Sequence, residues 1–433
     1  MKIAYCSPFS PIKSGISDFS EELVSKLKDK VEIDLFYDTP IENEEIRNGF
    51  NYYDISALDD PEFRGRYDHI VYQMGNNYDI HKCIGKAMMK YPGILELHDP
   101  SLHHYIAAEL IVSGKIDEYV ELIRYCHGEM GVEIVFDYLN GDAPPPWETH
   151  AMELSVNKHF IDKATGVIVH SDMAKQMVKA LRPDVPVINI PLHVTDLLPN
   201  SDELKRKAKK SLGISEDCYL FGSFGFATKT KRIYQVLEAV AKYKDHDFKY
   251  VVVGQCIGLD VVAEAQRLGI EDKVIVTGYT TLDEYKLYMQ ACDVCVNLRY
   301  PTNGESSANL QRILGMGIPA IVTDIGTFME YPDSCVVKVS YEDKEVDDIH
   351  NALRMLTSSA EDYKKYSENA YEFIKETASI EKNCEIYNSF FLDVKNNTFA
   401  EQDMIDLLLD RAFESGFDDE KYLVGMIKRA LEQ

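Results

Sequence analysis

Short apolar runs alternate with amphipathic stretches along most of the chain. The runs are rich in residues that favour strands, and parallel strands bury both faces and need helical crossovers. Between the runs, apolar residues recur at helical spacing; Phe19, Leu23 and Leu27 give a predicted helix over residues 18–27 one apolar face. The pattern predicts an α/β protein with strands at Lys2–Cys6, Val31–Tyr37, His69–Gln73, Gly93–Leu97, Gly166–His170, Val187–Ile190, Tyr219–Phe224, Tyr250–Val253, Val274–Thr277, Val294–Leu298, Ala320–Thr323 and Val336–Val339.

The predicted strands form two series. Proline and small polar residues replace the apolar pattern near residues 192–200, so we expect the boundary between two domains there. The domains are predicted to be doubly wound and Rossmann-like, with residues 1–195 and 196–378 facing one another across a cleft at the carboxyl ends of their strands. Residues 379–433 follow as a helical extension. Within it, apolar spacing over 396–433 predicts two short amphipathic helices, which either pack on the body or contact a second copy or partner.

The composition and charge narrow the class of protein. The chain has 433 residues, with 46 Lys and Arg against 72 Asp and Glu, and a formal net charge of −26. Residues 1–195 and 196–433 each contribute −13, so neither half offers the basic surface that nucleic acid or anionic membranes attract. No apolar run approaches the roughly 18 residues that cross a bilayer, and the start lacks the plan of a signal peptide. We therefore expect a cytoplasmic protein with at most peripheral membrane contact.

Cysteine and aspartate pairs do not predict a metal site. The nine cysteines are odd in number and scattered, which argues against a disulfide framework. Cys292 and Cys295 have CxxC spacing, but there is no second CxxC or nearby His, so we interpret them as buried thiols. The DxD motif of Asp245 and Asp247 lies between a predicted helix and strand, where an exposed loop is the simpler interpretation.

Loops that follow strands should line the predicted cleft. In the loop over 7–17, Gly15 lets the backbone approach a ligand, and the N–H groups of the helix that starts near Ser14 favour an anion. A simple tight turn is the alternative. The dinucleotide fingerprint GxGxxG is missing there, which argues against an NAD enzyme.

A cluster with His98 and Asp99 follows the fourth predicted strand. A metal site would require His98 and His104 to converge, whereas a single His that hydrogen-bonds a ligand hydroxyl needs no such coincidence, and we favour the latter. A helix cap by Asp99 or Ser101 with surface histidines is the third alternative. Asn76, which follows the third strand, offers an amide suited to polyhydroxylated ligands.

Three cations stand beside a predicted helix N-terminus in the second domain. Lys229, Lys231 and Arg232 oppose the usual dipole preference there, so they need an anion or an exposed position. A diphosphate would supply that anion. A solvated surface position is the alternative, more so for Lys229 than for Lys231.

The segment over 298–312 is the most specific one. Its Pro-Thr-Asn-Gly turn delivers Glu305 to a helix start, with an apolar face on the helix behind it. The N–H groups of Ser306, Ser307 and Ala308 can bind phosphate, while Glu305 accepts hydrogen bonds from sugar hydroxyls. An ordinary helix cap by Glu305 and Ser306 is the alternative.

Four motifs together resemble one enzyme family. In chain order they are SPIKSGISDFSEEL, YQMGNN, LHDPSLHH and LRYPTNGESSANLQRILGMGIPAIVTDIG. They resemble the retaining glycosyltransferases of the GT-B fold, family four (glycosyl transferases group 1), and the resemblance extends to about residue 393. It implies a nucleotide-sugar donor in the cleft, UDP- or GDP-linked, with no cofactor and no metal ion. It also implies a last helix, fitted by 380–391, that crosses back onto the first domain.

The resemblance also implies roles for individual residues. By motif match, Gly15 approaches the donor diphosphate, His98 contacts the donor sugar and Lys231 neutralises the leaving diphosphate, whose developing charge makes such a cation effective. No carboxylate is placed as a nucleophile, so we expect front-face attack in which a donor phosphate oxygen takes the acceptor proton. The implied catalytic residues are His98, Lys231 and Glu305, and the implied donor-binding residues are Gly15, Ser14, Asn76, Lys229, Arg232, Ser306, Ser307, Ala308 and Arg312.

The chain departs from the family pattern at two positions. The family often shows two Glu separated by seven residues, the second of which binds ribose, but Arg312 stands seven positions after Glu305. Ribose contacts are therefore expected to differ. An Arg commonly precedes the diphosphate Lys by five or six residues, and Phe226 stands there instead; either Lys229 compensates or donor affinity is low.

Three classes of function follow. We expect a glycosyltransferase of the hexosyltransferase type that transfers a sugar to a glycan, lipid-linked or protein acceptor, as in polysaccharide biosynthesis. A nucleotide-sugar epimerase or a phosphorylase on the same architecture is the first alternative. A catalytically silent subunit that binds nucleotide sugar is the second, because the second family Glu is missing.

Overall fold

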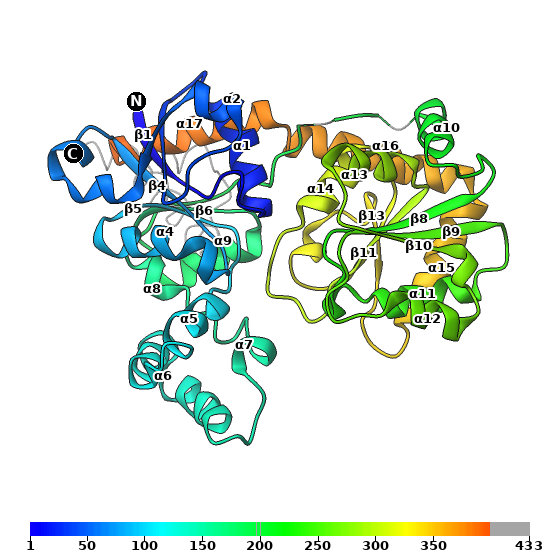
Figure 1. Ribbon diagram of the computed structural model, residues 1–433, viewed down its shortest axis with the longest axis horizontal. Helices are drawn as coiled ribbons and strands as arrows, with labels where there is room; N and C mark the ends of the chain where they lie inside the picture. Colours follow the sequence, from blue (N-terminus) through cyan, green and yellow to red (C-terminus); the bar gives the residue numbers. More distant parts are fainter. Residues whose placement is uncertain (196, 200, 399–433) are drawn as a thin grey trace, which may run out of the picture.

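Two parallel sheets form the core of the protein (Figure 1). The computed structural model describes residues 1–195, 197–199 and 201–398. The first sheet has the strand order β3-β2-β1-β4-β5-β6-β7 and the second has the order β10-β9-β8-β11-β12-β13. The strands are β1 (Lys2–Cys6), β2 (Glu32–Tyr37), β3 (Asn51–Asp54), β4 (His69–Met74), β5 (Gly93–Leu97), β6 (Ala164–Val169), β7 (Val187–Asn189), β8 (Tyr219–Phe224), β9 (Phe248–Val253), β10 (Val274–Gly278), β11 (Val294–Asn297), β12 (Ala320–Thr323) and β13 (Val336–Val339).

The strand order of each sheet reverses beside its first strand. The reversal lies between β1 and β4 in the first sheet and between β8 and β11 in the second, which is where doubly wound folds bind ligands. Every predicted strand is present, with ends shifted by at most two residues. The strand β3 was not predicted, since its sequence NYYD is short and half exposed. The predicted pair of Rossmann-like sheets is thus confirmed.

Helices cover both faces of each sheet (Figure 1). In the first half, α1 and α17 lie together on one face, and α4, α8 and α9 lie on the other. In the second half, α10, α13, α14 and α16 cover one face, and α11, α12 and α15 the other. The helices are α1 (Gly15–Leu27), α2 (Glu44–Gly49), α3 (Pro61–Arg64), α4 (Tyr78–Lys90), α5 (His103–Leu110), α6 (Ile116–Leu139), α7 (Pro146–Thr149), α8 (Lys158–Ile161), α9 (Asp172–Leu181), α10 (Asp202–Ser211), α11 (Ile233–Lys242), α12 (Val261–Leu268), α13 (Leu282–Ala291), α14 (Ala308–Gly315), α15 (Glu345–Ser358), α16 (Ala360–Thr377) and α17 (Ile380–Asn396).

Helices between β5 and β6 form a lobe below the first sheet (Figure 1). The lobe contains α5, α6 and α7, and α6 is kinked at Gly128, whose φ is +70°. Its apolar side chains join the core of the first sheet through Tyr119, Ile123 and Val135, each fully buried. The insert therefore extends the core of the first half beyond its sheet.

The helix α17 follows the helices of the second sheet but packs on the first. Its residues Tyr387, Phe390 and Phe391 are at most 1% exposed and belong to the core of the first sheet. The residues before α17 contact the segment that connects the first sheet to the second, since Val194 N donates to Ala378 O at 2.8 Å. The two helices predicted within 396–433 lie almost wholly outside the described residues. Within those residues, no helix is both long and apolar enough to cross a membrane.

The cysteine prediction can be compared directly, because all nine cysteines lie within the described residues. All nine are free thiols, and Cys292 and Cys295 are fully buried. Asp245 and Asp247 lie in the loop before β9, where they pair with Arg354 (2.5 Å) and Lys273 (3.6 Å). Both aspartates are exposed, which agrees with the interpretation of the DxD motif as an exposed loop.

Candidate functional site

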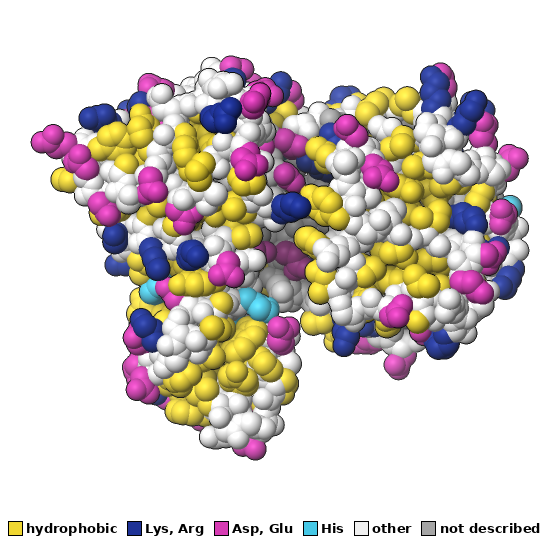
Figure 2. Space-filling view, viewed as in Figure 1, with side chains coloured by type: hydrophobic (Ala, Val, Ile, Leu, Met, Phe, Trp, Pro, Cys, Tyr) yellow, Lys and Arg dark blue, Asp and Glu magenta, His cyan; other side chains and the backbone are white. Residues whose placement is uncertain are grey.

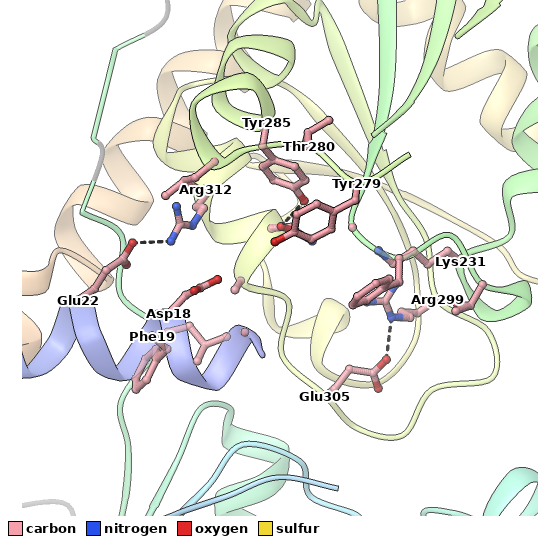
Figure 3. A pocket seen from close by; sticks show the side chains of 18 of the residues that line it. Asp18, Phe19, Glu22, Lys231, Tyr279, Thr280, Tyr285, Arg299, Glu305 and Arg312 are labelled. Atoms are coloured by element: carbon pink, nitrogen blue, oxygen red, sulfur yellow. Dashed lines mark hydrogen bonds and ion pairs between the residues drawn. The ribbon is translucent and has the colours of Figure 1, made fainter. Parts of the chain in front are cut away.

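A cavity of about 540 Å³ lies between the two sheets. Figure 2 shows the hollow between the two halves, and Figure 3 shows side chains that line the cavity. Its walls come from α1, from the loops after β8, β10 and β11, and from the start of α14, and its volume suits a small-molecule ligand. The predicted site residues that line it are Gly15, Lys231, Glu305, Ala308 and Arg312.

Lys231 points toward this cavity from a single 3-10 turn after β8. Its Nζ donates to the backbone oxygen of Phe224, and a Cβ on Gly225 would lie 2.7 Å from that nitrogen. Gly225 also has a φ of +85°, so a glycine is required both by the backbone and by the ammonium group. Burial, followed by the nearby Arg299, holds the pKa of Lys231 well below its usual range. An anion in the cavity would reverse that effect.

Glu305 lies at the other side of this wall, joined to Arg299 (Figure 3). Arg299 Nε donates to Glu305 Oε1 at 2.7 Å, and Asn303 N donates to Oε2 at 2.8 Å. Both charged side chains are less than a quarter exposed. The carboxylate is therefore fixed by its neighbours, while the guanidinium adds a second cation beside Lys231.

The start of α14 lies in the same region. Ser307 caps the helix, since its Oγ accepts from Leu310 N at 3.2 Å, and it is buried. Ser306 Oγ donates to His170 O of the first half at 2.9 Å. The hydroxyls of both serines are thus engaged, so a ligand would be bound by backbone N–H groups of the first turn, as in other anion sites at helix N-termini.

Arg312 makes an ion pair across the cleft. Its Nη2 donates to Glu22 Oε1 at 2.7 Å, and Glu22 lies on α1 of the first half (Figure 3). The second oxygen, Glu22 Oε2, lies 3.3 Å from His193 Nε2. Asp18, one turn earlier on α1, also lines the cavity, and burial raises its pKa. The wall on the side of α1 is therefore acidic, opposite the cations after β8 and β11.

A second cavity of about 460 Å³ continues on the side of the first sheet. Its lining includes the predicted residues Ser14, Asn76 and His98, and it shares Gly15 and Ala308 with the large cavity. A Cβ added to Gly15 would meet no atom within 4 Å, so this backbone faces open space. Ser14 caps α1, and its Oγ accepts from Ile16 N at 3.2 Å.

In the smaller cavity, the pKa values of the Asp99 carboxyl and the His98 imidazole are strongly shifted. Burial raises the pKa of Asp99 to about 6, and its Oδ2 accepts from Asn76 N at 2.7 Å. Burial, together with neighbouring imidazoles, lowers the pKa of His98 well below its ordinary value. His98 is therefore a neutral ring, and its Nε2 lies 2.7 Å from Gln73 Oε1.

The structure separates the histidines considered for a metal site. His104 contacts Asn76 Nδ2 at 3.3 Å and Glu148 at 3.1 Å. Among the described residues, the group of three with ligand atoms close together is instead Glu96, His98 and His170, within 4.8 Å of one another. Sequence spacing could not reveal this group, because its members come from β5, the end of β5 and the end of β6.

Three predicted donor-binding residues lie outside the cavities or make structural contacts. Lys229 is exposed and lies outside the lining of both cavities. Arg232, whose backbone is left-handed (φ +57°), pairs with the buried Glu345 at the start of α15 at 2.5 Å. The amide of Asn76 holds the start of α5, as its Oδ1 accepts from Tyr105 N at 3.0 Å. The first two do not join the site, and the third borders it in a structural role.

Several lining residues were not predicted. They are Asp18, Glu22, His193, Tyr279, Tyr285, Asn309 and Arg299. Arg299 had a signal, since it stands directly after a predicted strand in the most specific segment. Tyr279 forms the rim, 67% exposed, with the ammonium of Lys13 4.8 Å from its ring centre across the cleft. Asp18 and Glu22 lie on the polar face of α1, and the sequence pattern could not distinguish this face from one exposed to solvent.

The second half of the chain matches a known protein family. Residues 205–373 match the family model of glycosyl transferases group 1, which confirms the expectation of a glycosyltransferase. No curated protein sequence matches the chain.

Solved structures resemble nearly the whole chain. HepE from Anabaena in complex with UDP and glucose has a TM-score of 0.64 at 15% identity, over 90% of this chain and 98% of that one. Sucrose-phosphate synthase from Thermosynechococcus elongatus has a TM-score of 0.65 at 15% identity, over 91% and 99%. A glycosyltransferase from Rickettsia africae has a TM-score of 0.57 at 12% identity, over 91% and 98%. At these identities the similarity establishes the fold, which is the GT-B arrangement.

Proposed function

We propose that the chain transfers a sugar from a UDP-linked donor to a hydroxyl of a glycan, lipid-linked or protein acceptor, with retention of anomeric configuration. One observation carries this proposal: Lys231, Arg299 and the N-terminus of α14 converge on one cavity within the part of the chain that matches glycosyl transferases group 1. The choice of UDP is supported by HepE, which has the same fold and was solved with UDP-glucose.

The proposed reaction uses these groups for the departing diphosphate. The bond between the anomeric carbon and the diphosphate oxygen breaks, and negative charge develops on the leaving group. Lys231, Arg299 and the N–H groups of α14 are placed to stabilise that charge. The acceptor oxygen forms the new bond on the same face, and its proton passes to the departing phosphate oxygen.

The acidic side of the cavity is assigned to hydroxyl groups. Glu305 keeps acceptor capacity beyond its bond with Arg299, and Asp18 lies opposite on α1. Carboxylates accept hydrogen bonds from the hydroxyls of the sugar and of the ribose. We therefore place the sugar near Glu305 and His98, and the ribose toward α1.

Donor binding is tested first by thermal shift. UDP-glucose at 100 times its dissociation constant should add about 2.7 kcal/mol to the free energy of unfolding. The GDP-, ADP- and dTDP-linked analogues at the same concentration should add less. Unchanged melting temperatures with all four donors would contradict the proposal.

Turnover is tested by UDP release with and without an acceptor mixture. Lys231→Ala should lower the rate by ~10²- to 10³-fold, because it removes one electrostatic contributor. Lys244→Ala, the same change on an exposed lysine of the same half, is the control. Binding without turnover would identify a silent subunit, and epimerised donor would identify an epimerase.

A further inference from the structure

Buried hydrogen bonds lead from His98 into the first sheet, away from the cleft. His98 Nε2 lies 2.7 Å from Gln73 Oε1, and Gln73 Nε2 donates to Glu96 Oε2 at 2.6 Å. The hydroxyl of Tyr387 donates to the other oxygen, Glu96 Oε1. Gln73, Glu96 and Tyr387 are at most 1% exposed. We call these three residues the His98 network; it reaches from α17 to the cleft.

The network determines which ring nitrogen of His98 carries the proton. An amide oxygen only accepts, so the contact with Gln73 requires hydrogen on Nε2 and leaves Nδ1 as an acceptor. The amide of Gln73 is held in this orientation, because its NH₂ group faces an oxygen of Glu96. Gln73 and Glu96 are also direct partners in the pairing of β4 with β5.

Burying the carboxyl group of Glu96 inside the sheet carries an unfavourable free energy of desolvation. It is fully buried, and an apolar side chain of similar volume would avoid the loss of hydration. Its two donors come from β4 and from α17, so it connects the strand beside His98 to the helix that follows the second half. A purely structural core position does not require such a connection.

We infer that Gln73, Glu96 and Tyr387 are positioning residues that hold His98 in one orientation and in the Nε2-protonated tautomer, with Nδ1 as the acceptor for a hydroxyl of the bound sugars. This inference rests on the proposed function, because His98 contacts sugar only if the cavity binds a nucleotide sugar. The network acts through His98 and touches no substrate itself.

A metal ion is the competing interpretation of the same place. His170 Nδ1 bonds Ile190 O at 2.8 Å, and its Nε2 lies 3.7 Å from Glu96 Oε1 without a hydrogen-bond partner among the described residues. A metal held by Glu96, His98 and His170 would take a carboxylate oxygen that now accepts from the network. Elemental analysis of the purified protein therefore separates the two interpretations.

The test compares two tyrosines that differ in their partner. Tyr387→Phe removes the hydroxyl that donates to Glu96. Tyr250→Phe removes one from an equally buried tyrosine of the second sheet, whose hydroxyl donates to Ser223 Oγ at 2.9 Å. Gln73→Leu breaks the network next to the ring.

Two readouts are taken on the full chain. The first is the ring ¹⁵N chemical shifts of His98, assigned by their loss in His98→Gln. The second is kcat and the donor KM for UDP release. Gln73→Leu should mix the tautomers and lower kcat ~10- to 100-fold, with the donor KM changed less than about 3-fold. Tyr387→Phe should act in the same direction and less strongly, and Tyr250→Phe should change neither readout.

Each result decides the inference. It is overturned if Gln73→Leu leaves the ring shifts unchanged, if the shifts change without a loss of kcat, or if stoichiometric metal is found. Should Gln73→Leu fail to fold, Tyr387→Phe against Tyr250→Phe gives the same decision. The ¹⁵N measurement needs no donor. A chain that turns over no nucleotide sugar, yet loses its single tautomer in Tyr387→Phe, supports the positioning of the ring and refutes the proposed function.

Discussion

Replacing Glu96 by Gln should change how stability depends on pH. Burial raises the pKa of Glu96 from its ordinary value of 4.5 to about 7, against the opposing effect of its hydrogen bonds from Tyr387 and Gln73. The folded protein therefore holds this proton more tightly than the unfolded chain does. The corresponding stabilisation is fully present below pH 4.5 and is lost as the pH rises through 7.

The magnitude follows from the interval between the two pKa values. Each unit of pKa corresponds to 1.36 kcal/mol, so about 2 to 3 kcal/mol of the free energy of unfolding should disappear between pH 5 and pH 8. Glu96→Gln keeps the size of the side chain but cannot ionise. The variant should therefore gain about 2 to 3 kcal/mol relative to the wild type over this range.

Urea unfolding at pH 5, 6, 7 and 8 measures the difference between the two proteins. Groups shared by both that do not contact Glu96, such as Asp99, cancel in the comparison. Glu133→Gln, the same change on an exposed side chain, should show no such trend. Infrared spectra provide a direct check, because the C=O band of a protonated buried carboxyl should fade as the pH rises and should be absent in Glu96→Gln. A difference in stability that is the same at all four pH values would refute the reasoning.

Three further outcomes are expected. Gly225→Ala should lower the melting temperature more than Gly258→Ala, since both glycines have a positive φ, worth ~1–2 kcal/mol for alanine, but only the first would place a Cβ 2.7 Å from Lys231 Nζ; equal losses in thermal denaturation would contradict this. UDP binding should take up protons, because burial and then a nearby guanidinium lower the pKa of Lys231 and a diphosphate restores it; calorimetry in buffers of different ionisation enthalpy should show the uptake, and Lys231→Ala should remove it. Glu22→Gln and Arg312→Ala should each increase the radius of gyration in X-ray scattering, since either variant breaks the ion pair across the cleft. The double variant should show no larger increase than either single variant. Additive increases would show that the two side chains act separately.

The strands were the most predictable part of the fold. Runs such as Val294–Leu298 and Ala320–Thr323 are buried on both faces, so their apolar character is continuous and their location is clear from the sequence. The edge strand β3 escaped prediction, because Tyr52 and Tyr53 are only half buried and its ends are polar.

The candidate site was predictable where a residue stands at the carboxyl end of a strand. Lys231 and Glu305 line the cavity because the turns that carry them follow β8 and β11. Arg232 was not, since its partner Glu345 lies 113 residues away and nothing local reveals that pair. The same holds for Arg312 and Glu22, which are far apart in sequence and meet only when the two halves assemble.

The placement of α17 has a consequence for dissecting the protein. A fragment ending near residue 195 would expose the apolar surface that Tyr387, Phe390 and Phe391 now cover, at about 25 cal/mol for each Å² of apolar area. Such a fragment should aggregate when produced alone and should recover on addition of a synthetic peptide spanning 379–398. The folding unit of the N-terminal half is thus assembled from two separated stretches of chain, and during translation it is complete only after α17 has been synthesised.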